Sequence, residues 1–495
     1  MQNDSFNRPD TNRRLSLCVT ACVVILAVAT ALRIRGALND LWFDEIWSLH
    51  LADGISSPVE VFTKIHHDNN HYLNTLCLYF FGQRDNWPGY RIPSLVTGVG
   101  TVVLAGLIGR RRNAASAFLA MLLTGFSYVL VLYSSEARGY GPAVFFAFVS
   151  YYLMDGYLEK QKWQTALMFS FSVILGFMSQ LTFLCFFSAA FIWSGYRLIK
   201  SRLGFKRAVM ALLSCYAMPC VFLAVIYFVD IRRMAAGGGT YLPVGEKSVS
   251  HLLTGYGTAL AWALGTPSGG FITLLFGIIS SVFFAMGIKA LWSEKSDSIV
   301  FFIGVILAFP ILLVAIRPVF YGLYVRFFII SIAFFLILLS FVLESLWHRG
   351  RLGKACCLLL LTVYLVMNGL HTMSLFKDGR GHYGEAVHFL IEHSKGPQII
   401  IGGDHDFRIP PLLEFYCRGV GGGKQLIYDK QALWPPEGPE WIICHNDSFK
   451  GSMSPGTQIT DPAGNQYELV KTFPTAPLSG FYWFIYHNRT KCGNQ

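Results

Sequence analysis

Long runs of apolar residues recur through the first three quarters of the chain and decide what it can fold into. A helix of about 20 apolar residues crosses the hydrocarbon core of a bilayer. The chain is 53% hydrophobic and only 14% charged, far from the composition of a soluble globular protein. The sequence therefore predicts a mainly α-helical membrane protein, with about eleven spans at residues 15–34, 92–109, 115–134, 141–158, 165–178, 181–199, 208–229, 271–292, 299–316, 327–347 and 355–373.

Basic residues alternate between the loops in a way that orients these spans. Loops on the cytoplasmic side of a membrane carry an excess of lysine and arginine. If the amino terminus is cytoplasmic, one side collects Arg110, Arg111, Arg112, Lys160, Lys162, Arg197, Lys200, Arg202, Lys206, Arg207, Lys289, Lys295, His348, Arg349, Arg351 and Lys354. These loops account for most of the net charge of +11, so no nucleic-acid role is needed. An odd number of spans would place the carboxyl-terminal segment outside.

The predicted outer segments differ in character. Residues 35–91 form a long first loop, with interfacial helices expected over 42–52 and 58–68. The apolar stretch 71–81 is too short to span, so it is expected to lie in the membrane surface or to enter it partway. Residues 231–250 contain three consecutive glycines, which suit either a mobile flap or a static linker.

A small α/β domain is predicted from residue 374 to 495, following a membrane module over 1–373. Apolar density falls there, and helical patterns cover 383–393 and 410–416. Short apolar or β-branched runs predict strands at 398–401, 425–428, 441–444, 468–470 and 481–485.

A pair of adjacent carboxylates, Asp44 and Glu45, follows the first span on the predicted outer face. Trp42 and Trp47 enclose the pair. A carboxylate in a partly apolar pocket can have a raised pKa and can accept a proton from a hydroxyl group. Neighbouring residues on a helix point about 100° apart, so Glu45 is expected to orient Asp44 or a cation rather than share its proton. Both acids could instead serve only to stabilise the start of a helix through its dipole.

Arginines on the predicted outer face run against the charge bias and call for an anionic partner. Arg138 and Arg326 lie almost inside apolar segments, where an ionised group is costly unless it is paired or functional. The planar guanidinium suits phosphate oxygens. Arg232 and Arg233 are further candidates because they adjoin the glycine-rich segment. The alternative is that each side chain extends to water or to lipid headgroups.

Two polar segments complete the predicted outer site. Glu136 could orient Arg138, bind a metal or contact sugar hydroxyls, or the two could simply pair with each other. His66, His67 and His71 could hold a phosphate or a divalent cation, although surface histidines are common and no spacing requires a metal. We therefore assign no metal ligands.

The order of these motifs resembles the membrane glycosyltransferases of the GT-C class. The Asp44-Glu45 pair, the histidine-containing segment and Glu136-Ala137-Arg138-Gly139-Tyr140 are similar to motifs of the protein O-mannosyltransferases and of the lipid A aminoarabinose transferase. The resemblance covers most of residues 15–373. The chain departs from it at His71-Tyr72-Leu73, where His-Pro-Pro is usual, and at Arg326-Phe327, where Arg-Tyr is usual.

The resemblance implies transfer of a sugar from a polyprenyl phosphate donor to an acceptor hydroxyl, with inversion, at the outer face of the membrane. The compact loops, without a long lumenal insertion, favour a bacterial inner membrane. Asp44 would be the general base, and Arg138 and Arg326 would stabilise charge on the leaving phosphate. No tightly bound cofactor would be required, and a divalent cation stays an open alternative. The acceptor could be lipid, glycan or protein.

A flippase for lipid-linked sugars is the main alternative function. Transporters usually place polar residues near the middle of their spans, whereas the ionisable groups here gather at one predicted membrane face. An outer-domain receptor would leave these ionisable groups unexplained.

Overall fold

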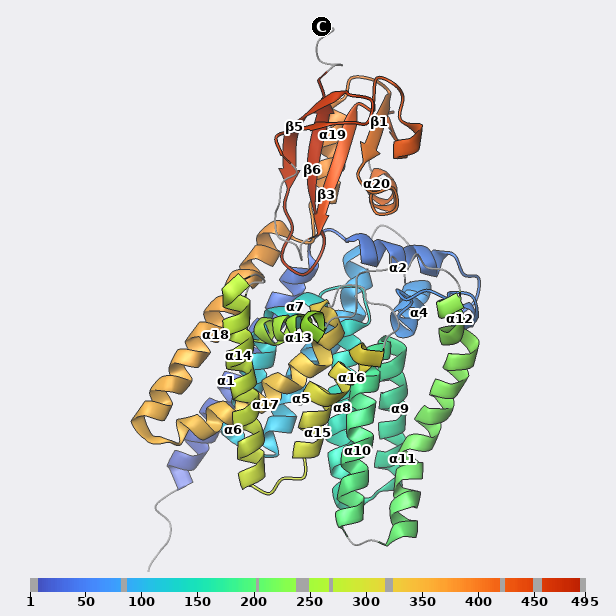
Figure 1. The fold of residues 1–495 in the computed structure, drawn as a ribbon. Helices are drawn as coiled ribbons and strands as arrows, with labels where there is room; N and C mark the ends of the chain where they lie inside the picture. The colour runs from blue at the N-terminus through green and yellow to red at the C-terminus, as the bar shows by residue number, and fades with distance from the viewer. Residues whose placement is uncertain are drawn as a thin grey trace, which may run out of the picture. The chain divides into compact units, whose positions relative to one another are not determined.

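The computed structural model describes residues 8–81, 87–201, 204–236, 249–266, 270–316, 324–418, 423–447 and 456–489. The chain divides into two compact units (Figure 1). The first comprises Met1–Ala37 and Leu51–Leu370, and the second comprises Leu38–His50 and His371–Gln495. The second unit therefore contains part of the predicted first outer loop as well as the carboxyl-terminal segment.

The first unit is helical. Its helices (α) and its 3₁₀ or π turns (η) are α1 Arg8–Ala37, α3 Glu60–Thr63, α4 Tyr72–Phe81, η1 Trp87–Arg91, α5 Ile92–Arg110, α6 Ala114–Phe126, α7 Tyr128–Tyr133, α8 Tyr140–Lys160, α9 Trp163–Ser179, η2 Leu181–Phe183, α10 Leu184–Lys200, α11 Phe205–Ile226, η3 Tyr227–Ile231, α12 Arg232–Ala236, α13 Val249–Ala263, α14 Gly270–Ser293, α15 Ile299–Ile303, η4 Gly304–Ala308, α16 Phe309–Ile316, η5 Val325–Phe328 and α17 Ile329–Trp347. Two helices, α2 Phe43–Asp53 and α18 Gly350–Asp378, have residues in both units.

The predicted membrane-embedded helical fold is confirmed. Among the described residues, seven helical segments are long and apolar enough to cross a membrane, namely Val19–Ala37, Pro88–Arg110, Leu181–Lys200, Phe205–Met234, Gly270–Ser293, Val325–Trp347 and Gly350–His393. Shorter apolar helices cover Tyr72–Phe81, Ala114–Phe126, Trp163–Ser179 and Ile299–Leu312. Helix α13 was not predicted. The run expected over 299–316 contains a π turn just before Pro310, whose ring lacks an N–H and cannot continue regular helical bonding.

Helix α17 forms the core of the first unit. The apolar window of this helix is 94% buried, and it is hydrophobic on every side, as expected for a helix enclosed by others. Phe334 packs its ring against those of Phe148, Phe186 and Phe301. Because α17 is fixed by this packing, the turn that precedes it holds Arg326 on a rigid support.

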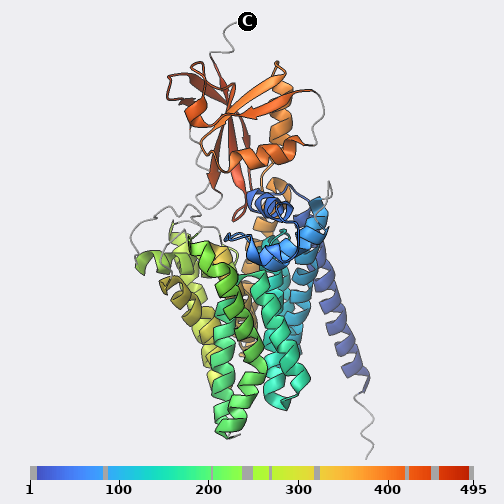
Figure 2. The ribbon, with the colours of Figure 1, turned by 90° about the vertical axis from the view of Figure 1, so that its right-hand side faces the viewer.

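The second unit is a six-stranded mixed sheet with two helices (Figure 2). Its elements are α19 Tyr383–His393, β1 Gln398–Gly403, α20 Ile409–Cys417, β2 Gln425–Tyr428, η6 Gln431–Leu433, β3 Trp441–Asp447, β4 Gln458–Thr460, β5 Gln466–Phe473 and β6 Phe481–Asn488. The strand order is β2-β1-β3-β6-β5-β4. Strand β1 runs parallel to β2 and β3, and the remaining pairs are antiparallel. The predicted α/β fold of this segment is confirmed.

Residues 38–50 are tied to the second unit by side-chain hydrogen bonds. Arg380 donates to Asn39 Oδ1 over 2.8 Å, and the Tyr416 hydroxyl donates to the Leu41 carbonyl over 2.8 Å. The backbone N–H of Gly384 donates to Asp40 Oδ2, also over 2.8 Å. The start of helix α2 is therefore held by the carboxyl-terminal segment, more than 300 residues away in the chain.

Gly139 permits a close approach that fixes the segment before α8. A Cβ atom at this position would lie 1.8 Å from the Ser179 carbonyl oxygen and 2.8 Å from His71 Nδ1. We expect Gly139→Ala to destabilise the protein by about 3 kcal/mol, because backbone atoms of two helices must separate. Gly195→Ala is the matched control, since nothing lies within 4 Å of its built Cβ. Thermal unfolding in detergent would measure both variants, and equal melting temperatures would contradict the close packing.

Candidate functional site

Asp44 and Glu45 lie in the first turn of α2, where their surroundings differ. Glu45 is fully buried, and its Oε2 accepts a hydrogen bond from the Trp42 backbone N–H over 3.3 Å. This bond to the residue that precedes the helix matches the reciprocal half of a capping box. Asp44 is half-buried, and its backbone carbonyl accepts from the Ser48 hydroxyl over 2.8 Å. Glu45 therefore stabilises the helix start, and its role in orienting Asp44 stays a prediction.

His71 and Arg138 form a buried pair in the first unit. Arg138 Nη2 lies 3.0 Å from His71 Nε2, and His71 Nδ1 lies 2.9 Å from the Ser179 carbonyl oxygen. A guanidinium has no acceptor, so Nε2 accepts and the proton of a neutral imidazole is on Nδ1. Both side chains are only 3% exposed, which is inconsistent with an arginine that extends to water. The Tyr140 ring lies 5.1 Å from the Arg138 guanidinium carbon and adds a cation–π contact.

The backbone of Arg138 is also fixed. Its carbonyl accepts from the Ser94 hydroxyl over 2.9 Å, and its N–H donates to the Glu136 carbonyl over 2.8 Å. Asn74 donates to the adjacent Ala137 carbonyl over 2.9 Å. Helices α4 and α5 thus clamp the turn that carries Glu136 and Arg138.

Asp68 lies within electrostatic range of both Arg138 and Arg326. A hydrogen bond with His67 is the main influence that lowers the pKa of Asp68; burial opposes this shift, and the charges of His67, Arg138 and Arg326 lower the pKa further. His67 Nδ1 is 3.0 Å from Asp68 Oδ1. Asp68, which the sequence reasoning did not single out, therefore contacts His67 and lies within electrostatic range of both predicted arginines.

Glu136 and Arg326 share a neighbour. Glu136 is fully buried, and the Tyr133 hydroxyl lies within electrostatic range of both residues. The guanidinium carbon of Arg326 is 4.7 Å from the centre of the Tyr324 ring and 5.9 Å from that of Phe327. A phenyl ring at residue 327 thus supplies the same stacking face as the tyrosine that is usual in the resembled family.

His66 pairs with a carboxylate that the sequence reasoning missed. Asp230 is fully buried in the π turn after α11; its Oδ1 is 2.6 Å from His66 Nδ1, and its Oδ2 accepts from the Tyr72 hydroxyl over 2.5 Å. The missed signal was an isolated acid at the end of the apolar run 208–229. These bonds tie the first outer loop to the end of α11 and fix the His66 ring, while its contact with phosphate stays a prediction.

Arg232 and Arg233 are exposed in α12. The Arg232 guanidinium carbon stacks over Phe228 at 5.6 Å from the ring centre. Within the described ranges, no contact joins either arginine to the His71–Arg138 pair. The glycine-rich segment next to them, 237–248, which was predicted to be a flap or a linker, lies outside the described residues.

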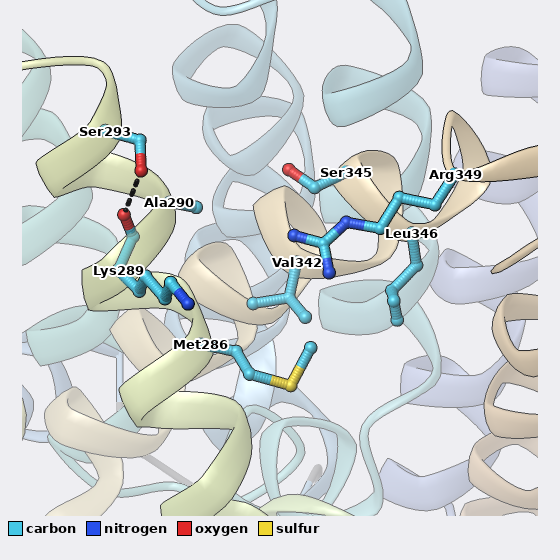
Figure 3. A pocket seen from close by; sticks show the side chains of 8 residues that line it. All are labelled: Met286, Lys289, Ala290, Ser293, Val342, Ser345, Leu346 and Arg349. Carbon is cyan, nitrogen blue, oxygen red and sulfur yellow. Dashed lines mark hydrogen bonds between the residues drawn. The ribbon is translucent and has the colours of Figure 1, made fainter.

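A small cavity lies at the other end of α17 from Arg326. It measures about 150 Å³ and lies between α14 and α17, with Lys289 and Arg349 at its rim and Met286, Val342 and Leu346 as its apolar lining (Figure 3). The cavity lies near the carboxyl-terminal end of α17, and Arg326 precedes the amino-terminal end, so the cavity is separate from the candidate site. Among the described residues, no group of three His, Cys, Asp or Glu side chains could hold a metal ion.

Comparisons with known proteins show that the fold is shared with solved structures. Residues 70–228 match the family model of dolichyl-phosphate-mannose-protein mannosyltransferases. ArnT from Cupriavidus metallidurans in the apo state superposes with a TM-score of 0.51 at 11% identity, over 96% of this chain and 98% of that chain. The structure of ArnT bound to undecaprenyl phosphate gives the same TM-score and identity, over 95% and 97%.

An archaeal structure is also similar. AglB from Archaeoglobus fulgidus, in complex with an inhibitory peptide and a dolichol-phosphate, has a TM-score of 0.50 at 9% identity, over 87% of this chain and 69% of that chain. A search of curated proteins finds no significant match. The resemblance to GT-C glycosyltransferases is confirmed, and the chain is an integral membrane protein with that fold.

Proposed function

We propose that the protein transfers a sugar from a polyprenyl phosphate carrier to an acceptor hydroxyl at the non-cytoplasmic face of a membrane. The observation that carries this proposal is the buried guanidinium of Arg138, which donates to Nε2 of a neutral His71; Arg326 lies within electrostatic range of Asp68, as Arg138 does. Preorganised positive groups of this kind stabilise charge that develops on a leaving phosphate. The likeness to ArnT bound to undecaprenyl phosphate and to AglB with dolichol-phosphate supports a lipid phosphate as the donor.

The proposed reaction is a single displacement with inversion. The acceptor oxygen forms a bond to the anomeric carbon as the bond from that carbon to the phosphate oxygen breaks. Asp44 takes the proton of the acceptor hydroxyl, and the polyprenyl phosphate leaves with the electron pair. Arg138 and Arg326 hold the phosphate, with Arg232, Arg233, His66, His67 and His71 as further contacts and Glu136 beside the sugar. The convergence of Asp44 with the arginines stays a prediction, because Asp44 belongs to the second unit and the arginines belong to the first.

The proposed location is a bacterial inner membrane with the site facing outward. The basic loops support this orientation, since the predicted inner side carries the lysine and arginine excess. The donor would reach the site from within the bilayer, and the acceptor could be a lipid, a glycan or a protein.

A transfer assay tests the proposal against the transporter alternative. The purified protein in detergent would receive a radiolabelled polyprenyl phosphate sugar together with membrane-derived acceptors. We expect label to move to an acceptor while free polyprenyl phosphate appears in equal amount. Label that stays on the polyprenol, but changes sides when the protein is placed in vesicles, would instead indicate a flippase.

A further inference from the structure

The second unit carries a polar network that the proposed chemistry does not use. His445 Nδ1 lies 2.7 Å from Asp404 Oδ1, and the His445 backbone N–H donates to Asp404 Oδ2 over 3.0 Å. On the other side of the ring, His445 Nε2 accepts from Arg408 Nη1 over 3.1 Å. Since the guanidinium can only donate, the imidazole is neutral with its proton on Nδ1. Asp404 thus holds the orientation of the His445 ring, and His445 in turn holds the orientation of the Arg408 guanidinium.

Arg408 keeps donors for another molecule. Among the described residues, its one side-chain hydrogen bond goes to His445, and its guanidinium carbon lies 4.9 Å from the centre of the Phe481 ring. A guanidinium has five N–H donors, so most of them stay available. Asp404 is 36% exposed, and its oxygens can accept further bonds.

Phe407, Trp47 and Phe43 form an aromatic cluster next to this network. Phe407 is 50% exposed, and the centre of its ring lies 5.0 Å from that of Trp47 and 5.5 Å from that of Phe43. Trp47 follows Asp44 by three positions on α2, so both residues face the same side of the helix. Trp47 and the proposed base Asp44 therefore belong to one helix.

The position of the network favours a ligand site over a purely structural role. Asp404 directly follows β1, and His445 lies in the second half of β3, which is parallel to β1. Ligands of open α/β sheets bind outside the carboxyl ends of such strands. A peptide that added itself to the sheet would use an edge strand instead, and the edges here are β2 and β4.

The charges select the chemistry of the ligand. Asp404, Asp406 and Arg408 together carry a net charge of about −1, which disfavours a phosphate or carboxylate. Burial is the main influence that lowers the pKa of His405, and the Arg408 charge adds to it, so this imidazole also stays neutral. The exposed ring of Phe407, beside the partly buried Trp47 and next to fixed donors and acceptors with little positive charge, suits the C–H faces and hydroxyl groups of a sugar.

We propose that Asp404, Arg408, Phe407 and Trp47 form a subsite for the saccharide head of the acceptor, presenting one of its hydroxyl groups to the helix that bears Asp44. This inference rests on the proposed function and narrows its acceptor from any hydroxyl compound to a saccharide. The saccharide could be the head of a glycolipid or part of a free glycan, since both offer the same hydroxyl groups and ring faces.

Saturation-transfer NMR on the full chain in a phosphocholine detergent would test the subsite without any donor. The probes are mannobiose, chitobiose, the octyl glycoside of each, and a Ser/Thr hexapeptide. We expect at least one disaccharide to bind, with affinity about tenfold lower in Arg408→Gln and about fivefold lower in Phe407→Ala. Arg418→Gln is the matched control, because Arg418 is an exposed arginine of the same unit that pairs only locally with Glu414. A glycolipid acceptor would favour the octyl glycosides over the free disaccharides.

Two further readings separate this inference from the proposed function. Asp44→Asn should still bind the disaccharide, because the asparagine carbonyl can accept the hydroxyl hydrogen bond although it cannot take the proton. Failure of transfer by the wild-type protein, with intact saccharide binding, would overturn the proposed chemistry and leave the subsite in place. Binding of the peptide alone, binding of no disaccharide, or equal affinity in the wild type and in correctly folded Arg408→Gln would each overturn the subsite.

Discussion

Asp44→Asn is expected to lower the rate of sugar transfer by about 10² to 10⁴ fold, because the amide cannot take the proton of the acceptor hydroxyl. Asn has nearly the same shape and stays compatible with the first turn of α2, so the loss of helix-dipole stabilisation should cost less than about 1 kcal/mol. The measurement is the rate of labelled product formation at saturating donor and acceptor, with thermal unfolding as a check of folding.

Glu45→Gln is the matched control for Asp44. The neighbouring carboxylate is fully buried and accepts from the Trp42 backbone N–H, a bond that a glutamine carbonyl can also accept. We expect this variant to keep most of its transfer rate while Asp44→Asn loses it. Full activity in Asp44→Asn would remove Asp44 as the base, and equal loss in both variants would point to the helix start rather than to proton transfer.

Arg138→Gln is expected to lower kcat by about 10² to 10³ fold, because the leaving phosphate would lose a preorganised positive group. His71 fixes this guanidinium within 3.0 Å, so no neighbouring side chain can take over its position without movement. Single-turnover rates with bound donor would measure the chemical step directly, and donor affinity should fall less than the rate if the arginine acts mainly in the transition state.

Arg91→Gln separates electrostatic catalysis from the general cost of removing a buried arginine. Arg91 is fully buried in the first unit and donates to the Ala37 carbonyl over 2.7 Å, a bond that a glutamine amide can replace. Both substitutions remove one buried positive charge. A turnover rate in Arg138→Gln that matches that of Arg91→Gln would contradict the assignment of Arg138 to the donor phosphate.

The pattern of apolar runs was sufficient for most of the fold. Every predicted span lies on described helices, because about 20 apolar residues in a row leave few alternatives to a membrane helix. Among the described residues, seven helical segments are long and apolar enough to cross a membrane, so the count of about eleven spans stays a prediction. Helix α13 and strand β4 escaped prediction for physical reasons. Glycine, serine and threonine residues within the α13 sequence break up its apolar pattern, although the helix itself is continuous. Strand β4 has only three residues, too few to show a clear alternation of apolar and polar residues.

The candidate site was predicted less completely. The sequence marked Arg138 and Arg326 because ionised groups near bilayer depth are costly, and it marked His71 because it stands in a polar segment beside an apolar one. It could not show that His71 orients Arg138, since 67 residues separate them. Asp230 and the Asp404–His445–Arg408 network were missed because each depends on partners brought together from distant segments.

The sequence by itself determined that this chain is a helical membrane protein with a mixed sheet domain, since hydrophobic burial follows the local periodicity of apolar residues. Only the tertiary structure decided which polar groups are partners. Residues 38–50 fold with a segment more than 300 positions later, and Arg138 is oriented by a histidine from another helix end. A buried polar group must find its hydrogen-bond partner wherever the packed chain supplies one, and sequence distance does not limit that choice.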